Sequence, residues 1–88
     1  MDEPAINAVG DSRLVLFQRD DCHLCDLALE VLAEVRTPEF ESVFIDGDEA
    51  LEERYGIRVP VLSDPTLGLE LDWPFDAAAV RGFISKRS

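Results

Sequence analysis

Histidine, basic side chains and long apolar runs are all scarce in this chain. It contains one histidine, so a hydrolytic site of the Ser–His–Asp type has few available parts. Its 8 lysine and arginine residues are outnumbered by 19 aspartate and glutamate residues, which gives a formal net charge of -11 at pH 7. A surface this acidic repels phosphate backbones and anionic membranes, so we expect neither nucleic acid nor membrane as a partner.

The length and the first residues bound the organisation and location of the protein. With 88 residues, 47% of them hydrophobic, the chain can build one modest core but not two. We therefore expect a single domain over residues 1–88 with one site, acting as a monomer. The start, Met1-Asp2-Glu3-Pro4, has no basic residue or long apolar run, and no segment reaches transmembrane length. These features predict a cytoplasmic protein.

The two cysteines stand close together, in Cys22-His23-Leu24-Cys25. Two cysteines placed at random in a chain of this length would have this separation only about 2% of the time. In a reducing cytosol, such a pair is more often catalytic or metal-binding than a structural disulfide. The motif is therefore the first candidate for a functional site.

Strand-like and helix-like segments alternate along the chain. Short continuous apolar runs predict strands, and apolar residues three and four apart predict helices. In chain order the predicted elements are a strand at 13–18, a helix at 24–36, a strand at 42–45, a helix at 48–55, a strand at 57–63 interrupted by Pro60, a strand at 69–71 and a helix from 76 to about 86. The first two strands should be parallel and the last two should form an antiparallel hairpin. This order predicts an α/β sandwich around a small mixed sheet.

Three residue types indicate where the predicted helices begin and end. Thr37-Pro38 should end the first helix, because the residue before a proline avoids the helical conformation. Gly56 suits a left-handed terminus of the second helix, and Asp76 can cap the start of the last one.

The pattern resembles a known family. A strand that leads into Cys-x-x-Cys at a helix start, followed later by Val59-Pro60 before a strand, is similar to the thioredoxin fold in its minimal, glutaredoxin-like form. The resemblance runs from about Leu14 to Ile84 and implies β-α-β-α-β-β-α order, with a four-stranded mixed sheet flanked by three helices. Within it, the Cys-His-Leu-Cys motif and the Tyr-Gly-Ile-Arg-Val-Pro segment are similar to small bacterial glutaredoxin-like proteins.

The resemblance gives Pro60 a role. A proline inside a sheet ladder lacks the N–H that the ladder needs. In thioredoxin-like proteins the equivalent proline is cis and lies against the cysteine pair, and the residue before it pairs with an incoming peptide. The resemblance therefore implies a cis Val59-Pro60 bond and a substrate-binding role for both residues; a proline at a sheet edge or bulge is the alternative.

The two cysteines are expected to have different tasks. Cys22, at the first helical turn, would face unpaired N–H groups and the positive end of the helix dipole, which stabilise a thiolate. It is the predicted nucleophile. Cys25, one turn further in and shielded, would attack the mixed disulfide at Cys22 and release the reduced substrate.

Arg19 and His23 are predicted to support the cysteine pair by supplying positive charge, which Asp20, Asp21 and Asp26 oppose. For His23 an equally weighted alternative is an exposed side chain with no role. Arg19 matches a position where a glutaredoxin lysine holds a glutathione carboxylate, and this leaves glutathione open as a co-substrate.

Two departures from glutaredoxins bear on the substrate. Leu24 stands where a tyrosine often helps to seat glutathione, and the segment 72–76 replaces a Gly-Gly turn that binds the γ-glutamyl group. From this segment we assign Trp73 and Asp76 to the substrate site, with core packing the stronger alternative for Trp73.

The leading hypothesis is a thiol–disulfide oxidoreductase without a tightly bound cofactor. Its partners would be a disulfide-containing protein or glutathione, with a reductase as electron donor. A metal or iron–sulfur carrier with a cluster shared between subunits is the alternative, although Cys22, His23 and Cys25 offer at most three ligands. A third hypothesis is a binding module without catalysis. An acidic cluster lacks calcium-loop spacing and is expected to be a solvated helix face; its members are Asp46, Asp48, Glu49, Glu52 and Glu53.

Overall fold

The computed structural model describes residues 14–86, and its elements follow the predicted order. In chain order they are β2 (Leu14–Gln18), α1 (His23–Glu34), β3 (Phe40–Phe44), α2 (Glu49–Tyr55), β4 (Val61–Asp64), β5 (Leu69–Asp72) and α3 (Ala77–Lys86). No helix within the described residues is long and apolar enough to cross a membrane.

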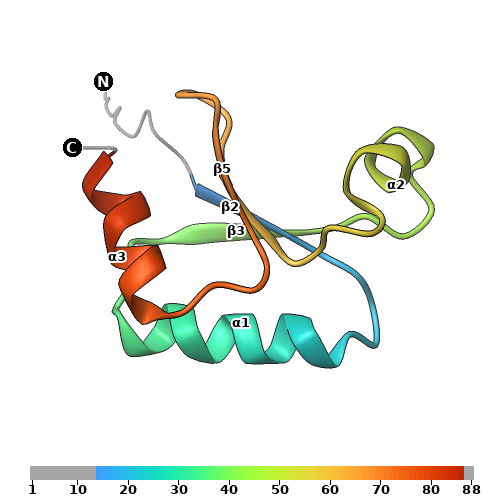
Figure 1. The fold of residues 1–88 in the computed structure, drawn as a ribbon. Coiled ribbons are helices and arrows are strands. Elements are labelled where there is room, and N and C mark those ends of the chain that lie inside the picture. The colour runs from blue at the N-terminus through green and yellow to red at the C-terminus, as the bar shows by residue number, and fades with distance from the viewer. Residues whose placement is uncertain (1–13, 87–88) are drawn as a thin grey trace, which may run out of the picture.

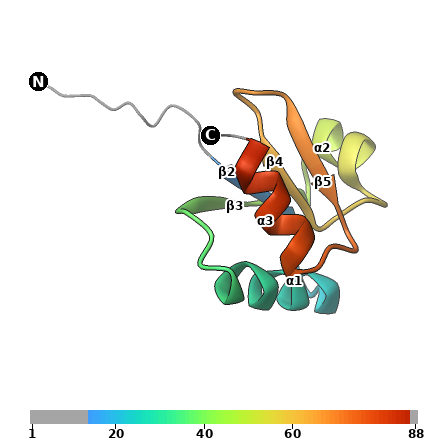
Figure 2. The ribbon, with the colours of Figure 1, turned by 60° about the vertical axis from the view of Figure 1, so that its left-hand side comes forward.

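The four strands form one mixed sheet in the order β3-β2-β4-β5. β2 is parallel to β3, with Leu16 opposite Ser42, and antiparallel to β4, with Leu16 opposite Leu62. β5 returns antiparallel beside β4, as the hairpin prediction requires. The arrangement is the minimal thioredoxin fold predicted from the sequence, and Figure 1 and Figure 2 show α1 and α3 together on one side of the sheet.

Successive side chains of the strands alternate between the two faces of the sheet, so the apolar residues form two clusters. Leu16 and Leu62 lie at the centre of the larger cluster, which packs against α1 and α3. Its buried members are Leu14, Leu16, Ala28, Leu32, Leu62, Phe75, Val80 and Phe83. The neighbouring strand residues Phe17 and Val61 belong to a smaller cluster with Tyr55 of α2. Because successive side chains of a strand point to opposite faces, one sheet can bury both sets.

Tyr55 is the buried residue of α2 and packs against the sheet. Its ring stacks on Phe17 with the centroids 4.1 Å apart and the planes 16° apart. The guanidinium groups of Arg54 and Arg58 lie 5.3 and 5.1 Å from the same ring centroid. Stacking and cation–π contacts of this kind favour one orientation of the helix.

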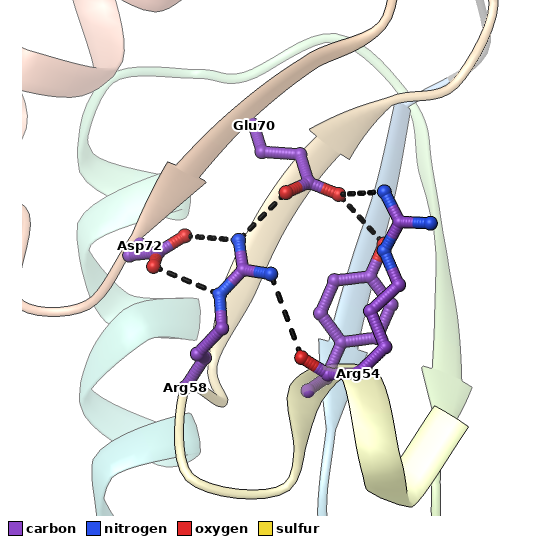
Figure 3. A network of polar contacts seen from close by, with 5 residues as sticks. Arg54, Arg58, Glu70 and Asp72 are labelled. Carbon is purple, nitrogen blue, oxygen red and sulfur yellow. Dashed lines mark hydrogen bonds and ion pairs between the residues drawn. The ribbon is translucent and has the colours of Figure 1, made fainter. Parts of the chain in front are cut away.

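Arg58 and Glu70 organise a polar network that joins the end of α2 to β5 (Figure 3). Arg58 donates two hydrogen bonds to Asp72, at 2.9 and 2.7 Å, and one of 2.6 Å to Glu70. Glu70 also accepts a 2.7 Å hydrogen bond from the Tyr55 hydroxyl and a 3.3 Å one from Arg54. Burial acts to raise the pKa of Glu70, but the hydrogen bonds from Arg58 and Tyr55 outweigh it and leave that pKa below its usual value.

The helix termini differ in part from the expectations. Asp76 caps α3 as predicted, since its Oδ1 accepts the N–H of Ala79 at 2.9 Å. α1, however, ends at Glu34 rather than Arg36, because Arg36 has a left-handed φ of 55°. The prediction of a left-handed Gly56 is wrong: its φ is -49° and its ψ -44°, and a β-carbon there would collide with the carbonyl oxygen of Glu52.

The strand predicted over residues 57–63 begins only at Val61. The N–H of Val59 instead donates to the carbonyl of Tyr55 at 3.0 Å, so the chain before Pro60 continues the last turn of α2. Pro60 therefore precedes the ladder and does not interrupt it. The Val59–Pro60 and Trp73–Pro74 peptide bonds are both cis.

Leu62 and Leu67 provide a matched test of where the core lies. We expect Leu62→Ala to lower the free energy of unfolding by about 2–5 kcal/mol, because it empties a fully buried position in the larger cluster. Leu67→Ala, in the turn where that side chain is 48% exposed, should cost less than about 0.5 kcal/mol. Urea unfolding of both variants measures the difference, and equal losses would contradict this placement of the core.

Glu70→Gln tests the polar network. At pH 7 it should lower the free energy of unfolding by about 1–2 kcal/mol, because it weakens charge-assisted hydrogen bonds. A carboxyl group whose pKa is lower in the folded protein stabilises above its unfolded pKa, about 4.3, and loses this as the pH falls through the folded pKa. In urea unfolding, the gap between wild type and variant should therefore narrow as the pH falls below that reference value. Glu53→Gln, an exposed change on α2, is the control, and a pH-independent gap at Glu70 would count against the network.

Candidate functional site

Cys22 follows the tight turn that leaves β2. The N–H of Asp20 in this turn donates to Oδ1 of Asp46 at 2.8 Å, which ties the turn to the end of β3. Asp21 has a left-handed φ of 56°, a conformation that aspartate adopts more readily than most residues. Cys22 is then extended, with φ -112° and ψ 109°, and stands at the N-cap of α1.

The sulfur of Cys22 caps the helix. Its Sγ accepts the backbone N–H of Cys25 at 3.2 Å, as the oxygen of a serine or aspartate cap would. The positive end of the α1 dipole points at the same atom. Both effects favour negative charge on this sulfur.

Cys25 has a different environment from Cys22. It is 2% exposed, whereas Cys22 is half-buried, and both are free thiols. Burial, followed by the hydrogen bond between its thiol and Cys22, raises the pKa of Cys25 to about 11. The pair therefore combines an accessible sulfur at a helix terminus with an enclosed one that keeps its proton.

Arg19 is held by α2. Its guanidinium donates two hydrogen bonds to the Glu52 carboxylate, at 3.0 and 2.7 Å, and a third of 3.0 Å to the carbonyl of Gly56. The hydrogen bond to Glu52 is the main cause of the raised pKa of Arg19. Its charge is thus compensated within the protein, while His23 is exposed on the first residue of α1.

The strand register brings the segments of Pro60 and Trp73 to the edge of the sheet where β2 leads into the cysteine motif. Val61, just after Pro60, pairs with Phe17 on one side and with Asp72 on the other. The N–H of Trp73 donates to the carbonyl of Pro60 at 3.1 Å. Val59 packs against the cluster of Tyr55 and is partly buried.

Trp73 and Asp76 have structural contacts of their own. Trp73 packs against the larger cluster and meets Phe75 edge to face, with the ring centroids 5.0 Å apart. Asp76 is exposed, and its Oδ1 is used by the α3 cap. These contacts favour the core-packing alternative for Trp73.

A cavity of about 490 Å³ opens beside the cysteine pair. Within the described part of the chain its lining comprises Gln18, Arg19, Asp20, Asp21, Cys22, His23, Cys25, Asp26, Leu29 and Phe44. Of the predicted site residues, the cavity thus gathers both cysteines, Arg19 and His23. Val59, Pro60, Trp73 and Asp76 are not among these lining residues.

Asp46, Glu52 and Phe44 belong to this region although no site role was predicted for them. The cluster of acidic residues is only partly a solvated face: Asp46 binds the Asp20 N–H, Asp48 caps α2 and Glu52 pairs with Arg19. Asp46 could have been found, because the carboxyl ends of the parallel strands β2 and β3 meet at one edge. The Arg19–Glu52 pair has no comparable sequence signal.

Metal ligands do not gather in the described residues. Over residues 14–86, no group of three or more His, Cys, Asp and Glu side chains is arranged to hold a metal ion.

Two solved proteins resemble this chain closely in structure. The X-ray structure of target protein XcR50 from X. campestris is 62% identical, has a TM-score of 0.79 and covers 83% of this chain and 96% of its own. The solution structure of Ne2328 from Nitrosomonas europaea is 31% identical, with a TM-score of 0.69, and covers 90% of this chain and 98% of its own. No curated protein matches the chain.

The family model agrees with the structural neighbours. A model described as "Glutaredoxin-like domain (DUF836)" matches residues 13–85, nearly the whole described chain. The match includes the Cys22–Cys25 motif, all four strands and most of α3. The chain therefore belongs to the glutaredoxin-like (DUF836) family.

Proposed function

We propose that this protein is a thiol–disulfide oxidoreductase in which Cys22 is the nucleophile and Cys25 the resolving thiol. The observation that carries the proposal is the contrast within the pair. Cys22 is accessible and accepts a helix N–H, whereas Cys25 is enclosed, protonated and hydrogen-bonded to Cys22. This division of labour is what two-step disulfide exchange requires.

The exchange proceeds in two balanced steps. The Cys22 thiolate attacks one sulfur of a substrate disulfide, so a mixed disulfide forms and one substrate thiolate leaves. Cys25 then loses its proton and attacks the Cys22 sulfur, which forms the Cys22–Cys25 disulfide and releases the second thiolate. The substrate gains two electrons and the protein loses two. A reductase or a small thiol returns the pair to the dithiol.

The raised pKa of Cys25 suits a thiol that reacts only in the second step. A buried thiol with a raised pKa does not compete with Cys22 for the incoming disulfide. Once the mixed disulfide exists, Cys25 is adjacent to it, and proximity compensates for the small thiolate fraction.

Val59 and Pro60 are proposed to receive the substrate backbone. The support is topological, because the antiparallel pairing of Val61 with Phe17 sets Pro60 at the edge from which the Cys22 turn leaves. The partly buried Trp73, bonded to Pro60 through its N–H, would border the same region.

Cys22→Ser and Cys25→Ser should fail in different ways. Cys22→Ser should lose disulfide reductase activity by about 100-fold or more, since it removes the attacking sulfur but keeps a capping oxygen. Cys25→Ser should instead accumulate a mixed disulfide at Cys22, which intact-mass measurement detects. Circular dichroism of both variants checks folding. If Cys22→Ser keeps full activity, the proposal is wrong; if folded protein never forms the mixed disulfide, the domain is a binding module.

The reactivity of Cys25 should follow its raised pKa. In the wild type, iodoacetamide should modify Cys22 first, and modification of Cys25 should rise up to about pH 11. Because folded Cys25 holds its proton more tightly, its contribution to stability is complete below the unfolded pKa, about 9, and is lost as the pH rises toward 11. Peptide mapping after timed alkylation gives both rates. Urea-unfolded protein is the control, and equal profiles for Cys25 in the two states would contradict the assignment.

A further inference from the structure

The cavity beside Cys22 carries a net negative charge. Asp20, Asp21 and Asp26 contribute three carboxylates to its lining, all on exposed residues. The one guanidinium of the lining belongs to Arg19, and its charge is compensated by the bidentate pair with Glu52. His23 is the remaining residue of the lining with a basic side chain, and it is exposed.

Two large apolar side chains near the cysteine pair are exposed. Phe44 lines the cavity and is 51% exposed, although it ends a strand of the sheet. Leu24, on the first turn of α1 between the cysteines, is 44% exposed. Large apolar side chains this exposed beside a reactive thiol favour contact with apolar side chains of a partner.

We infer that the substrate of Cys22 is a polypeptide disulfide with lysine or arginine beside the bridge and an apolar neighbour, rather than the anionic glutathione disulfide. The inference rests on the proposed disulfide exchange and names the substrate class of the same site. Positive charge near the bridge meets Asp20, Asp21 and Asp26, and the apolar neighbour meets Phe44 and Leu24. Glutathione, with a net negative charge, meets repulsion and finds Arg19 occupied by Glu52.

The size of the effect follows from Coulomb's law. In water, the interaction of two unit charges about 7 Å apart changes the probability of an encounter by about 2.7-fold. Three carboxylates acting together should thus separate a cationic from an anionic reagent by roughly ten-fold or more at low salt. At 1 M salt, where the screening length is about 3 Å, the ratio should fall toward about two-fold.

The first experiment does not depend on enzyme activity. Methanethiosulfonate reagents transfer an alkylthio group to a cysteine thiolate: a mixed disulfide forms, the S–S bond of the reagent breaks and methanesulfinate leaves. They exist in cationic, neutral and anionic forms. The initial rate of Cys22 modification is measured with each form at low and high salt. Each rate is divided by the rate of the same reagent with 2-mercaptoethanol, which corrects for its intrinsic reactivity. The cationic form should be favoured by roughly ten-fold over the anionic one, with the preference shrinking at high salt.

A matched pair of variants locates the charge. Asp21→Asn combined with Asp26→Asn should reduce the preference by about three- to ten-fold, whereas Glu34→Gln at the far end of α1 should change it little. A preference that is absent, that favours the anionic reagent, or that Glu34→Gln reduces equally overturns the inference.

The second experiment distinguishes substrate classes. The substrates are symmetric disulfides of three short peptides, in which the sequence Cys-Leu is preceded by Lys, Ser or Glu. Their rates of reduction are compared with those of cystamine and glutathione disulfide. The Lys peptide should be reduced fastest, and replacing its Leu by Gly should slow it by about three-fold or more. If cystamine is reduced as fast as the Lys peptide, the substrate need not be a polypeptide and that part of the inference is overturned. If glutathione disulfide is reduced fastest, the inferred preference for positive charge is overturned. If nothing is reduced while Cys22 still prefers the cationic reagent, the proposed function fails and the charge selectivity stands.

Discussion

The antiparallel pairing of β2 with β4 is the constraint on which the rest of this structure depends. Because Phe17 stands opposite Val61, the chain leaving β2 toward Cys22 and the chain entering β4 from Pro60 meet at one edge of the sheet. If this register shifted by one residue, one of the two facing leucines, Leu16 or Leu62, would turn to the other face of the sheet, away from α1 and α3. Burial of the two leucines therefore fixes the position of the site as well as the fold.

The electrostatics of the site follow from how few basic groups the chain has. Arg19 is shared between Glu52 and Gly56, and Arg58 between Glu70 and Asp72. Both guanidinium groups thus serve to attach α2 and its following turn to the sheet and the cysteine loop. The carboxylates around Cys22 therefore have no uncompensated arginine beside them in the cavity lining. Because the arginines are engaged in ion pairs that hold the fold together, a substrate meets a negatively charged site.

Most of the fold was predictable from the sequence because its signals are local. Apolar runs gave the strands, and spacing of three and four gave α1 and α3. The errors occur where backbone contacts compete with pattern: Arg36 ends α1 early in a left-handed conformation, and Val59 bonds back to Tyr55 instead of entering a strand. The cysteine pair could be recognised from its spacing within four residues. The partner of Arg19, by contrast, is 33 residues away in sequence, and no sequence pattern indicates it.

The hydrogen bond from Arg19 to the carbonyl of Gly56 has a mechanical consequence. Arg19 comes three residues before Cys22, and Gly56 four residues before Pro60, so one guanidinium spans the two loops that flank the site. The spacing of these loops is set through α2, a helix of seven residues that contributes no side chain to the cavity lining. Substitutions in α2 can therefore retune the separation of the sulfur from the proline loop while the Cys-x-x-Cys motif itself stays unchanged.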